Sequence, residues 1–220
     1  SNAAEALAAL RTCSSSSSVD MDSDRLRGWP ASAAMPARSH IATSAAGAAD
    51  GGSMDPGPHY LGEGIPFVSR QAVKRDLSFM LEAAVDKKIP MLIGSTGGGG
   101  SEPQIAFVRE VVEEIAAEKG LHFDMAVIHS EQSAESLKAK RADGKIEPLG
   151  PIAELTDSDI DESSRVVAMM GVEPFQAALK GGAQVVLAGR ATDASIFSAI
   201  PLMRGAHPGL SWHLSKIIEC

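Results

Sequence analysis

A glycine-rich segment, Gly94–Ser101, follows the apolar run Pro90–Ile93 and precedes a helical pattern. Four consecutive glycines are entropically costly, so we expect a backbone that closely approaches another group or adopts positive φ. N–H groups at a helix N-terminus attract anions, and three hydroxyl side chains add donors. We therefore expect anionic-ligand contacts from Ser95, Thr96, Gly97, Gly98, Gly99, Gly100 and Ser101. The alternative is a flexible turn that only lets the helix pack on the strand.

This segment is not a recognised nucleotide-binding fingerprint. It reads G-S-T-G-G-G-G-S, which lacks both the Walker lysine and the G-x-G-x-x-G spacing.

A second candidate, Gly189–Asp193, follows the apolar run Gln184–Ala188. A guanidinium leaving a buried strand needs an anionic partner for its five donors. Arg190 is therefore predicted to bind a phosphate or carboxylate. Asp193 either takes part in that site or serves as the carboxylate partner and helix N-terminal acid.

Three further residues are candidates for proton transfer. Asp55 and His59 lie in a proline-stiffened segment, S-M-D-P-G-P-H-Y, where either is suited to act as a general base. The same residues are also ordinary turn chemistry. His129 directly follows the apolar run ending at Ile128, although a lone histidine there is more often simply hydrogen-bonded.

Other site types lack a pattern in the sequence. No H-E-x-x-H, C-x-x-C or paired-aspartate motif indicates a dedicated metal site. No G-x-S-x-G indicates a hydrolase triad, and no cofactor can be assigned.

The surrounding elements alternate between short apolar runs and helical periodicity. Strands are predicted at 90–93, 123–128 and 184–188, and helices at about 69–87, 101–119, 134–142, 173–180, 192–199 and 210–219, with a helical first turn after Thr156. This pattern predicts an α/β fold, a three-layer parallel (Rossmann-like) sheet with helices on both faces. Because ligands bind at the carboxyl ends of such strands, the loops after them should share one site. Residues 53–60 join it if a strand precedes them.

The first 52 residues differ from the rest. Residues 1–3 resemble a tag remnant, and residues 14–18 and 31–49 are low in large apolar side chains. We predict a largely disordered arm over residues 1–52 and a folded domain over 53–220.

Bulk properties narrow the partners. The net charge of −8 disfavours nucleic acid and anionic membranes, and no run is apolar enough to span a bilayer. Two cysteines near opposite ends favour a reducing compartment. Exposed apolar residues on the last predicted helix make a homodimer possible.

Several segments resemble the acyclic terpene utilisation (AtuA-like) family, a domain of unknown function. They are S-M-D-P-G-P-H-Y-L-G-E-G, I-P-M-L-I-G-S-T-G-G-G-G-S-E-P and M-G-V-E-P-F-Q-A-A-L-K-G-G-A-Q-V-V-L-A-G-R-A-T-D-A-S-I-F, with A-V-K-R-D-L-S-F-M-L and H-P-G-L-S-W-H-L-S-K-I-I-E-C. The resemblance runs from about residue 53 to residue 220. It implies a cytoplasmic protein of terpene catabolism, a route through acyl-CoA thioesters, and assigns no catalytic residue. Family members extend past the point matching Cys220, so an N-terminal portion is implied.

Two hypotheses follow. The first is an enzyme or binding protein that holds a small anionic metabolite, a CoA ester or branched carboxylate, with the glycine segment, Arg190 and Asp193 binding it and Asp55, His59 or His129 moving protons. The second is a non-catalytic binding or assembly module of a larger metabolic complex.

Overall fold

The computed structural model describes residues 10–12, 46–53 and 55–219 of the chain. Its strands are β1 (Leu10–Thr12), β2 (Gly47–Asp50), β3 (Met91–Gly94), β4 (Asp124–Ile128) and β5 (Val185–Ala188). Its helices are α1 (His59–Glu63), α2 (Arg70–Lys87), α3 (Glu102–Lys119), α4 (Ala134–Ala142), α5 (Asp157–Glu162), α6 (Glu173–Lys180), α7 (Asp193–Met203) and α8 (Pro208–Glu219).

The strands form one sheet in the order β1-β4-β5-β3-β2. Neighbours among β2, β3, β5 and β4 pair in parallel, whereas β1 pairs antiparallel with β4 at the opposite edge. The parallel α/β class predicted from the sequence is confirmed. Because the four parallel strands point the same way, their carboxyl ends meet at one edge of the sheet.

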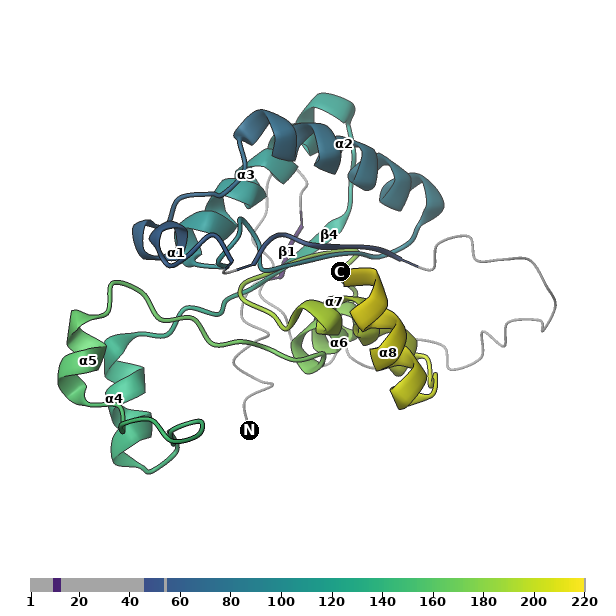
Figure 1. Ribbon diagram of the computed structural model, residues 1–220. Coiled ribbons are helices and arrows are strands. Elements are labelled where there is room, and N and C mark those ends of the chain that lie inside the picture. Colours follow the sequence, from purple (N-terminus) through teal and green to yellow (C-terminus); the bar gives the residue numbers. More distant parts are fainter. Residues whose placement is uncertain (1–9, 13–45, 54, 220) are drawn as a thin grey trace.

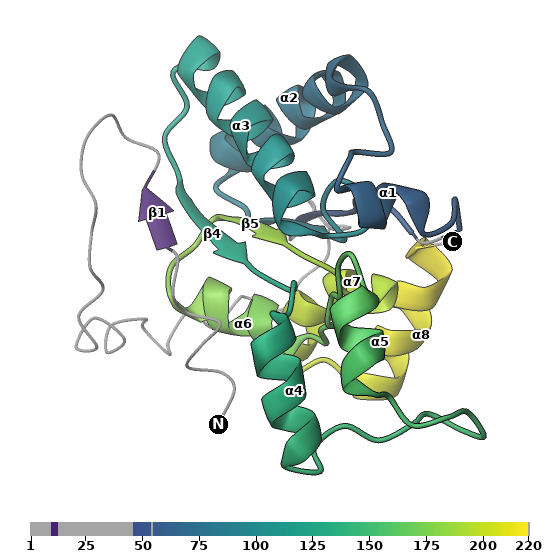
Figure 2. The same cartoon turned by 90° about the vertical axis from the view of Figure 1, so that its left-hand side faces the viewer.

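Helices cover both faces of the sheet (Figures 1 and 2). Helices α2 and α3 lie on one face, and α6, α7 and α8 lie on the other. Each face has its own apolar core. Leu81, Val112 and Ile115 are fully buried in the first core, and Phe175, Ile196 and Ala199 are buried in the second. Burying each large apolar side chain contributes roughly 1.5–3 kcal/mol, so these two layers hold the strand ends in place.

Local sequence explains where several helices begin. Ser69 caps α2 by accepting from the Ala72 N–H, and Thr156 caps α5 by accepting from the Asp159 N–H. Both helix starts were predicted from the sequence. The predicted ranges of α3, α4 and α6 also agree with the structure to within a residue. The helix after Thr192 is longer than predicted, because it continues through Pro201 to Met203.

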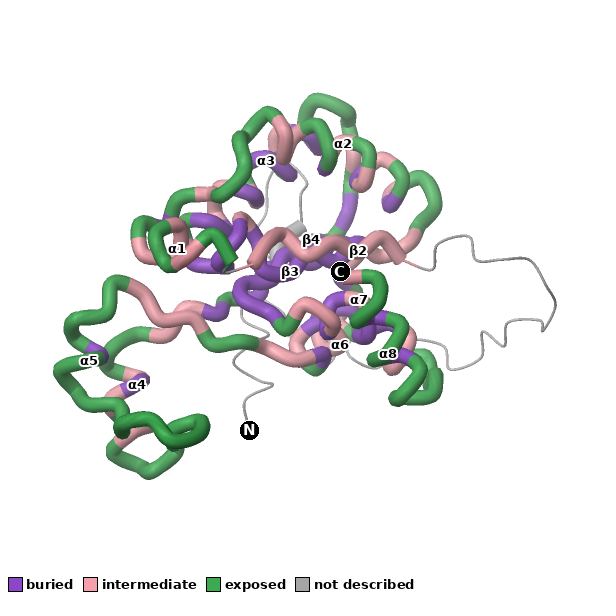
Figure 3. Tube along the Cα trace, in the orientation of Figure 1, coloured by how far each residue is buried: buried purple, intermediate pink, exposed green. Residues whose placement is uncertain are grey.

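Strand β2 lies inside the segment for which little ordered structure was predicted. It satisfies the condition under which residues 53–60 belong to the carboxyl edge, since it ends at Asp50. Most of the remaining residues of 1–52 lie outside the described residues. The strand is built from small residues and is only half-buried, as expected for an edge strand (Figure 3).

Helices α4 and α5 pack on each other beyond the end of the sheet, with the exposed loop 143–156 between them (Figures 2 and 3). Helix α8 packs on α7 through a buried contact between the Ser198 and Ser215 hydroxyls, 2.7 Å apart. Its outer side carries exposed Leu210, Leu214, Ile217 and Ile218.

Candidate functional site

The glycine-rich loop, residues 94–101, is enclosed by the protein's own chain. Every residue in it is buried except Gly97, which is partly exposed. A methyl group added to Gly100 would lie 2.2 Å from the backbone nitrogen of Arg190, and one added to Gly97 would lie 2.7 Å from Gln104 Cβ. Gly97 and Gly100 also have φ of +74° and +76°. Close backbone approach and positive φ therefore account for these glycines, and both reasons were expected from the sequence.

Most N–H groups of this loop already have acceptors. Ser95 and Thr96 donate to the carbonyl oxygens of Gly189 and Ala188, and Gly98 donates to that of Ser95. The Thr96 hydroxyl donates to the Ala188 carbonyl at 2.6 Å. For the N–H groups of Gly97 and Gly100, no acceptor is found among the described residues. Since Gly97 is the partly exposed member, it is the loop residue best placed to meet a ligand.

Gln104 connects this loop to helices α3 and α1. Its Oε1 atom accepts from the N–H groups of Gly99 and Ser101 at 3.1 Å and from the Ser101 hydroxyl at 3.0 Å. Its Nε2 atom donates to the carbonyl oxygens of Ile65 and Tyr60 at 2.8 and 3.3 Å. The side chain is fully buried, so these bonds satisfy a polar group that would otherwise be costly to bury. Its capping spacing was predicted, but its contacts with the segment around α1 were not.

The N-terminus of α3 is also occupied from within the protein. The Glu102 N–H donates to Glu131 Oε2 at 2.8 Å, and Arg165 pairs with Glu131 Oε1 at 2.9 Å. A carboxylate therefore takes the position at which an anionic ligand was expected to meet the helix dipole.

His129 is exposed and pairs with a carboxylate at the same helix end. Its Nδ1 atom lies 2.7 Å from Glu102 Oε2. An acid beside one ring nitrogen fixes the ring's orientation and leaves Nε2 for other contacts. Glu102 was not singled out by the sequence, although it directly follows the predicted capping serine.

Asp55 and His59 contact only their own segment among the described residues. Asp55 Oδ2 accepts from the Ser53 hydroxyl at 2.8 Å, and the His59 ring meets the Tyr60 ring edge-on with centroids 5.4 Å apart. Both side chains are exposed. Among the described residues, no hydrogen bond joins these three predicted proton-transfer residues to each other or to Arg190.

Arg190 does join several predicted site residues. Its Nη1 atom donates to the Ser95 hydroxyl at 3.1 Å and to the Gly52 carbonyl at 3.3 Å. Its Nη2 atom lies 3.7 Å from Asp193 Oδ1. Ser95 itself has φ of +45°, an uncommon backbone conformation for a residue with a side chain. The pairing of Arg190 with Asp193 is the structural alternative that the sequence left open.

Asp50 is the residue of this group that sequence reasoning missed. It ends β2, and its carboxylate interacts with Ser95, Arg190 and the Gly52 N–H. Burial and the neighbouring charge of Asp193 raise the pKa of Asp50 to about 6, while those three contacts lower it by less. We call Asp50, Ser95, Arg190 and Asp193 the polar cluster. Perturbed carboxyl groups of this kind concentrate at functional sites.

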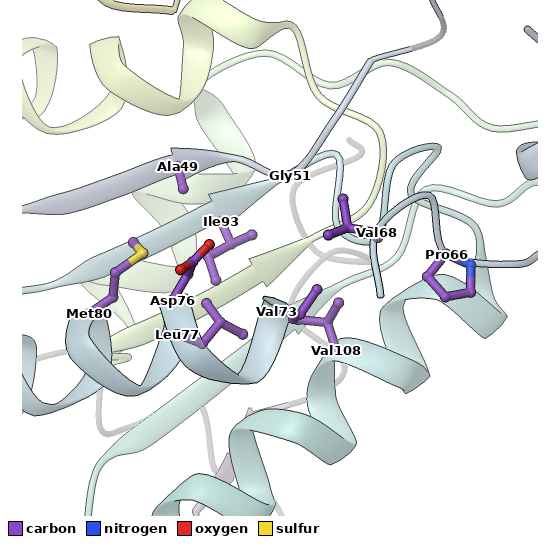
Figure 4. Close-up of a pocket in the computed structure, with 11 residues that line it drawn as sticks. Ala49, Gly51, Pro66, Val68, Val73, Asp76, Leu77, Met80, Ile93 and Val108 are labelled. Carbon is purple, nitrogen blue, oxygen red and sulfur yellow. The ribbon is translucent and has the colours of Figure 1, made fainter. Parts of the chain in front are cut away.

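A largely apolar cavity of about 180 Å³ lies between β2, β3, α2 and α3 (Figure 4). Branched side chains from α2, α3, β3 and the segment before α2 point into it, including Val68, Val73, Leu77, Ile93 and Val108. The rest of the lining is made by the carboxylate-bearing Asp76 and by Ala49, Gly51, Pro66, Met80 and Gly97. Ala49 and Gly51 alternate in the chain with Asp50 and Gly52 of the polar cluster and its contacts. Successive residues of a strand face opposite sides, so at the end of β2 Asp50 faces away from the cavity that Ala49 lines.

Other site types do not appear in the described part of the chain. Residues 10–12, 46–53 and 55–219 contain no group of three or more metal-ligating side chains placed to hold an ion. Their helices are also too short or too polar to cross a membrane.

Comparison with known families identifies the domain. Residues 70–204 match the family described as "Acyclic terpene utilisation family protein AtuA". The chain belongs to this AtuA family. The match spans the glycine-rich loop, Arg190 and Asp193, and it ties the domain to acyclic terpene utilisation. No curated protein and no solved structure matches the chain significantly, so residue roles in this AtuA protein come from its own geometry.

Proposed function

We propose that this protein binds a small anionic intermediate of acyclic terpene breakdown, a branched carboxylate or its CoA thioester. The observation that carries the proposal is the apolar cavity in Figure 4, because its branched lining matches the methyl-branched hydrocarbon of an acyclic terpene. Family membership supplies the substrate class.

The polar end of the ligand is assigned to Gly97. This residue lines the cavity, is partly exposed, and has an N–H without an acceptor among the described residues. A carboxylate or thioester oxygen of a ligand that lies next to Gly97 in the cavity would accept a hydrogen bond from that N–H. Exposed Ile65, Phe67 and Val68 extend the apolar surface beyond the cavity, which suits a chain longer than the cavity itself.

Filling the cavity tests this proposal. Ala49→Leu adds a larger side chain from β2 into the cavity, and Ala83→Leu makes the same change at an exposed position on α2. In a thermal-shift titration with geranate, we expect the melting temperatures of wild type and Ala83→Leu to rise by about 2–4 °C for each kcal/mol that the bound ligand adds to the free energy of unfolding. Ala49→Leu should lose most or all of this ligand-induced rise in melting temperature. Equal shifts in all three proteins would refute the assignment of the cavity.

A straight-chain acid separates this role from general fatty-acid binding. Decanoate has the same total number of carbon atoms as geranate but no methyl branches, and we expect it to raise the melting temperature of wild type less than geranate does.

A further inference from the structure

The polar cluster brings together side chains from three strand ends that are distant in sequence. Asp50 ends β2, Ser95 follows β3, and Arg190 and Asp193 follow β5. The Arg190 side chain is only 10% exposed. A nearly buried guanidinium between two carboxylates is costly unless its donors are satisfied, so the detail of its contacts is informative.

The charges of the cluster disfavour another anion. One guanidinium faces Asp193 at 3.7 Å and interacts with Asp50, which leaves a net negative charge when both acids are ionised. A phosphate or carboxylate placed there would meet two like charges at low dielectric. A ligand group that fits this cluster is therefore neutral.

Two atoms of the cluster define what that neutral group must do. Both hydrogen bonds of the Arg190 guanidinium leave from Nη1, and the 3.7 Å between Nη2 and Asp193 Oδ1 is too long for a hydrogen bond. Asp193 Oδ1 is buried and has no hydrogen-bond partner among the described residues. An oxygen between these atoms has to accept from Nη2 and donate to Oδ1. A hydroxyl does both, whereas a carbonyl only accepts and an ammonium only donates.

We propose that the polar cluster is a binding site for a hydroxyl group of the ligand, held between Arg190 Nη2 and Asp193 Oδ1. The site itself follows from the cluster's contacts, and only the hydrocarbon part of the ligand rests on the proposed function. Asp193 Oδ1 is itself buried, whereas the Asp193 side chain as a whole is 31% exposed, so the ligand hydroxyl reaches Oδ1 through a change of the Asp193 rotamer. Asp50 and Ser95 hold the guanidinium in place from the opposite side.

Matched small probes test the site. Isoamyl alcohol donates and accepts a hydrogen bond, isoamyl methyl ether only accepts, and isovalerate carries a negative charge. In titrations followed by amide NMR, we expect the alcohol to perturb the amide signals of Asp50, Gly52 and Asp193. A charge-assisted hydrogen bond supports a dissociation constant about tenfold lower for the alcohol than for the ether. Isovalerate should not perturb these signals.

Two variants assign the preference to Asp193. Asp193→Ala removes the acceptor and should make the alcohol and the ether bind equally, whereas Asp193→Asn keeps an acceptor oxygen and should retain part of the preference. Glu173→Ala is the control, because Glu173 is the first-turn acid of α6 as Asp193 is of α7. It should keep the full preference.

The outcomes separate this proposal from the binding of terpene acids. Equal binding of alcohol and ether by wild type, or an unchanged preference in Asp193→Ala, would overturn the hydroxyl site. A failure of geranate to bind would overturn only the proposed function.

Discussion

At Asp50, burial and electrostatic contacts act in opposite directions on one carboxyl group. Burial and the charge of Asp193 raise its pKa to about 6, against the lowering effect of the Gly52 N–H, Ser95 and Arg190. A carboxyl group whose pKa is raised on folding binds its proton more tightly in the folded state. Its contribution to stability is therefore full below the unfolded value of 3.8 and is lost as the pH rises through about 6.

Replacing Asp50 with asparagine should remove this pH dependence. We expect the melting temperature of Asp50→Asn to gain on that of wild type as the pH rises from 4.5 to above 6, by roughly 1–3 °C, a small effect because the group is only partly buried. Melting curves between pH 4.5 and 8 measure the difference. Asp86→Asn, on the exposed side of α2, gives the effect of removing one surface charge. A wild-type protein that gains stability relative to Asp50→Asn as the pH rises would show that the sign is wrong.

The sequence indicated some residues of the polar cluster but not others. Arg190 and Asp193 stood out because they follow a clearly apolar strand at a spacing that suits an ion pair. Asp50 did not, because β2 reads G-A-A-D, with none of the branched or aromatic residues that mark a strand. Its place is set by pairing with β3, which is a long-range contact.

At the scale of elements, the glycine-rich loop packs tightly between strands and helices. Gly100 lies against the backbone of Arg190, and Gln104 ties the loop to α1. Anion contact by the whole loop was predicted from its sequence. The structure restricts the accessible part to Gly97, because the other glycines are covered by residues far away in the chain.

Alanine substitutions separate packing from backbone conformation at these glycines. Gly100 and Gly144 have similar positive φ, +76° and +67°, but only Gly100 has atoms within reach of an added methyl group. We expect Gly144→Ala to lower the free energy of unfolding by about 1 kcal/mol from conformation alone. Gly100→Ala should lower the free energy of unfolding by about 3 kcal/mol or more, because the neighbouring backbone at Arg190 must move. Urea denaturation measures both, and equal losses would contradict a packing role for Gly100.

Helix boundaries were the most predictable elements, because their signals are local. Ser69, Thr156 and Gly120 mark helix ends by side-chain capping or by a left-handed backbone. Helix α1 was not predicted. It is five residues long in a proline- and glycine-rich segment, and it is held by bonds from Gln104 on a distant helix.

At the scale of the whole molecule, the sequence predicted the class of fold but not the order of its strands. Alternating apolar runs and helical patterns specify parallel strands with helices on both faces. The order β4-β5-β3-β2 depends on which faces pack together, which no local pattern specifies. The cavity was not predicted from the sequence for the same reason, since its lining comes from β2, β3, α2, α3 and the loops beside them.

The most direct test of the central claim, that the cavity holds a branched terpene acid, is to locate bound geranate by NMR. We predict nuclear Overhauser contacts between the geranate methyl groups and the methyl groups of Val73, Leu77 and Ile93, with the Gly97 amide signal shifting at the same ligand concentrations. Contacts located instead on the exposed apolar side of α8, or no saturable binding of geranate, would contradict the claim.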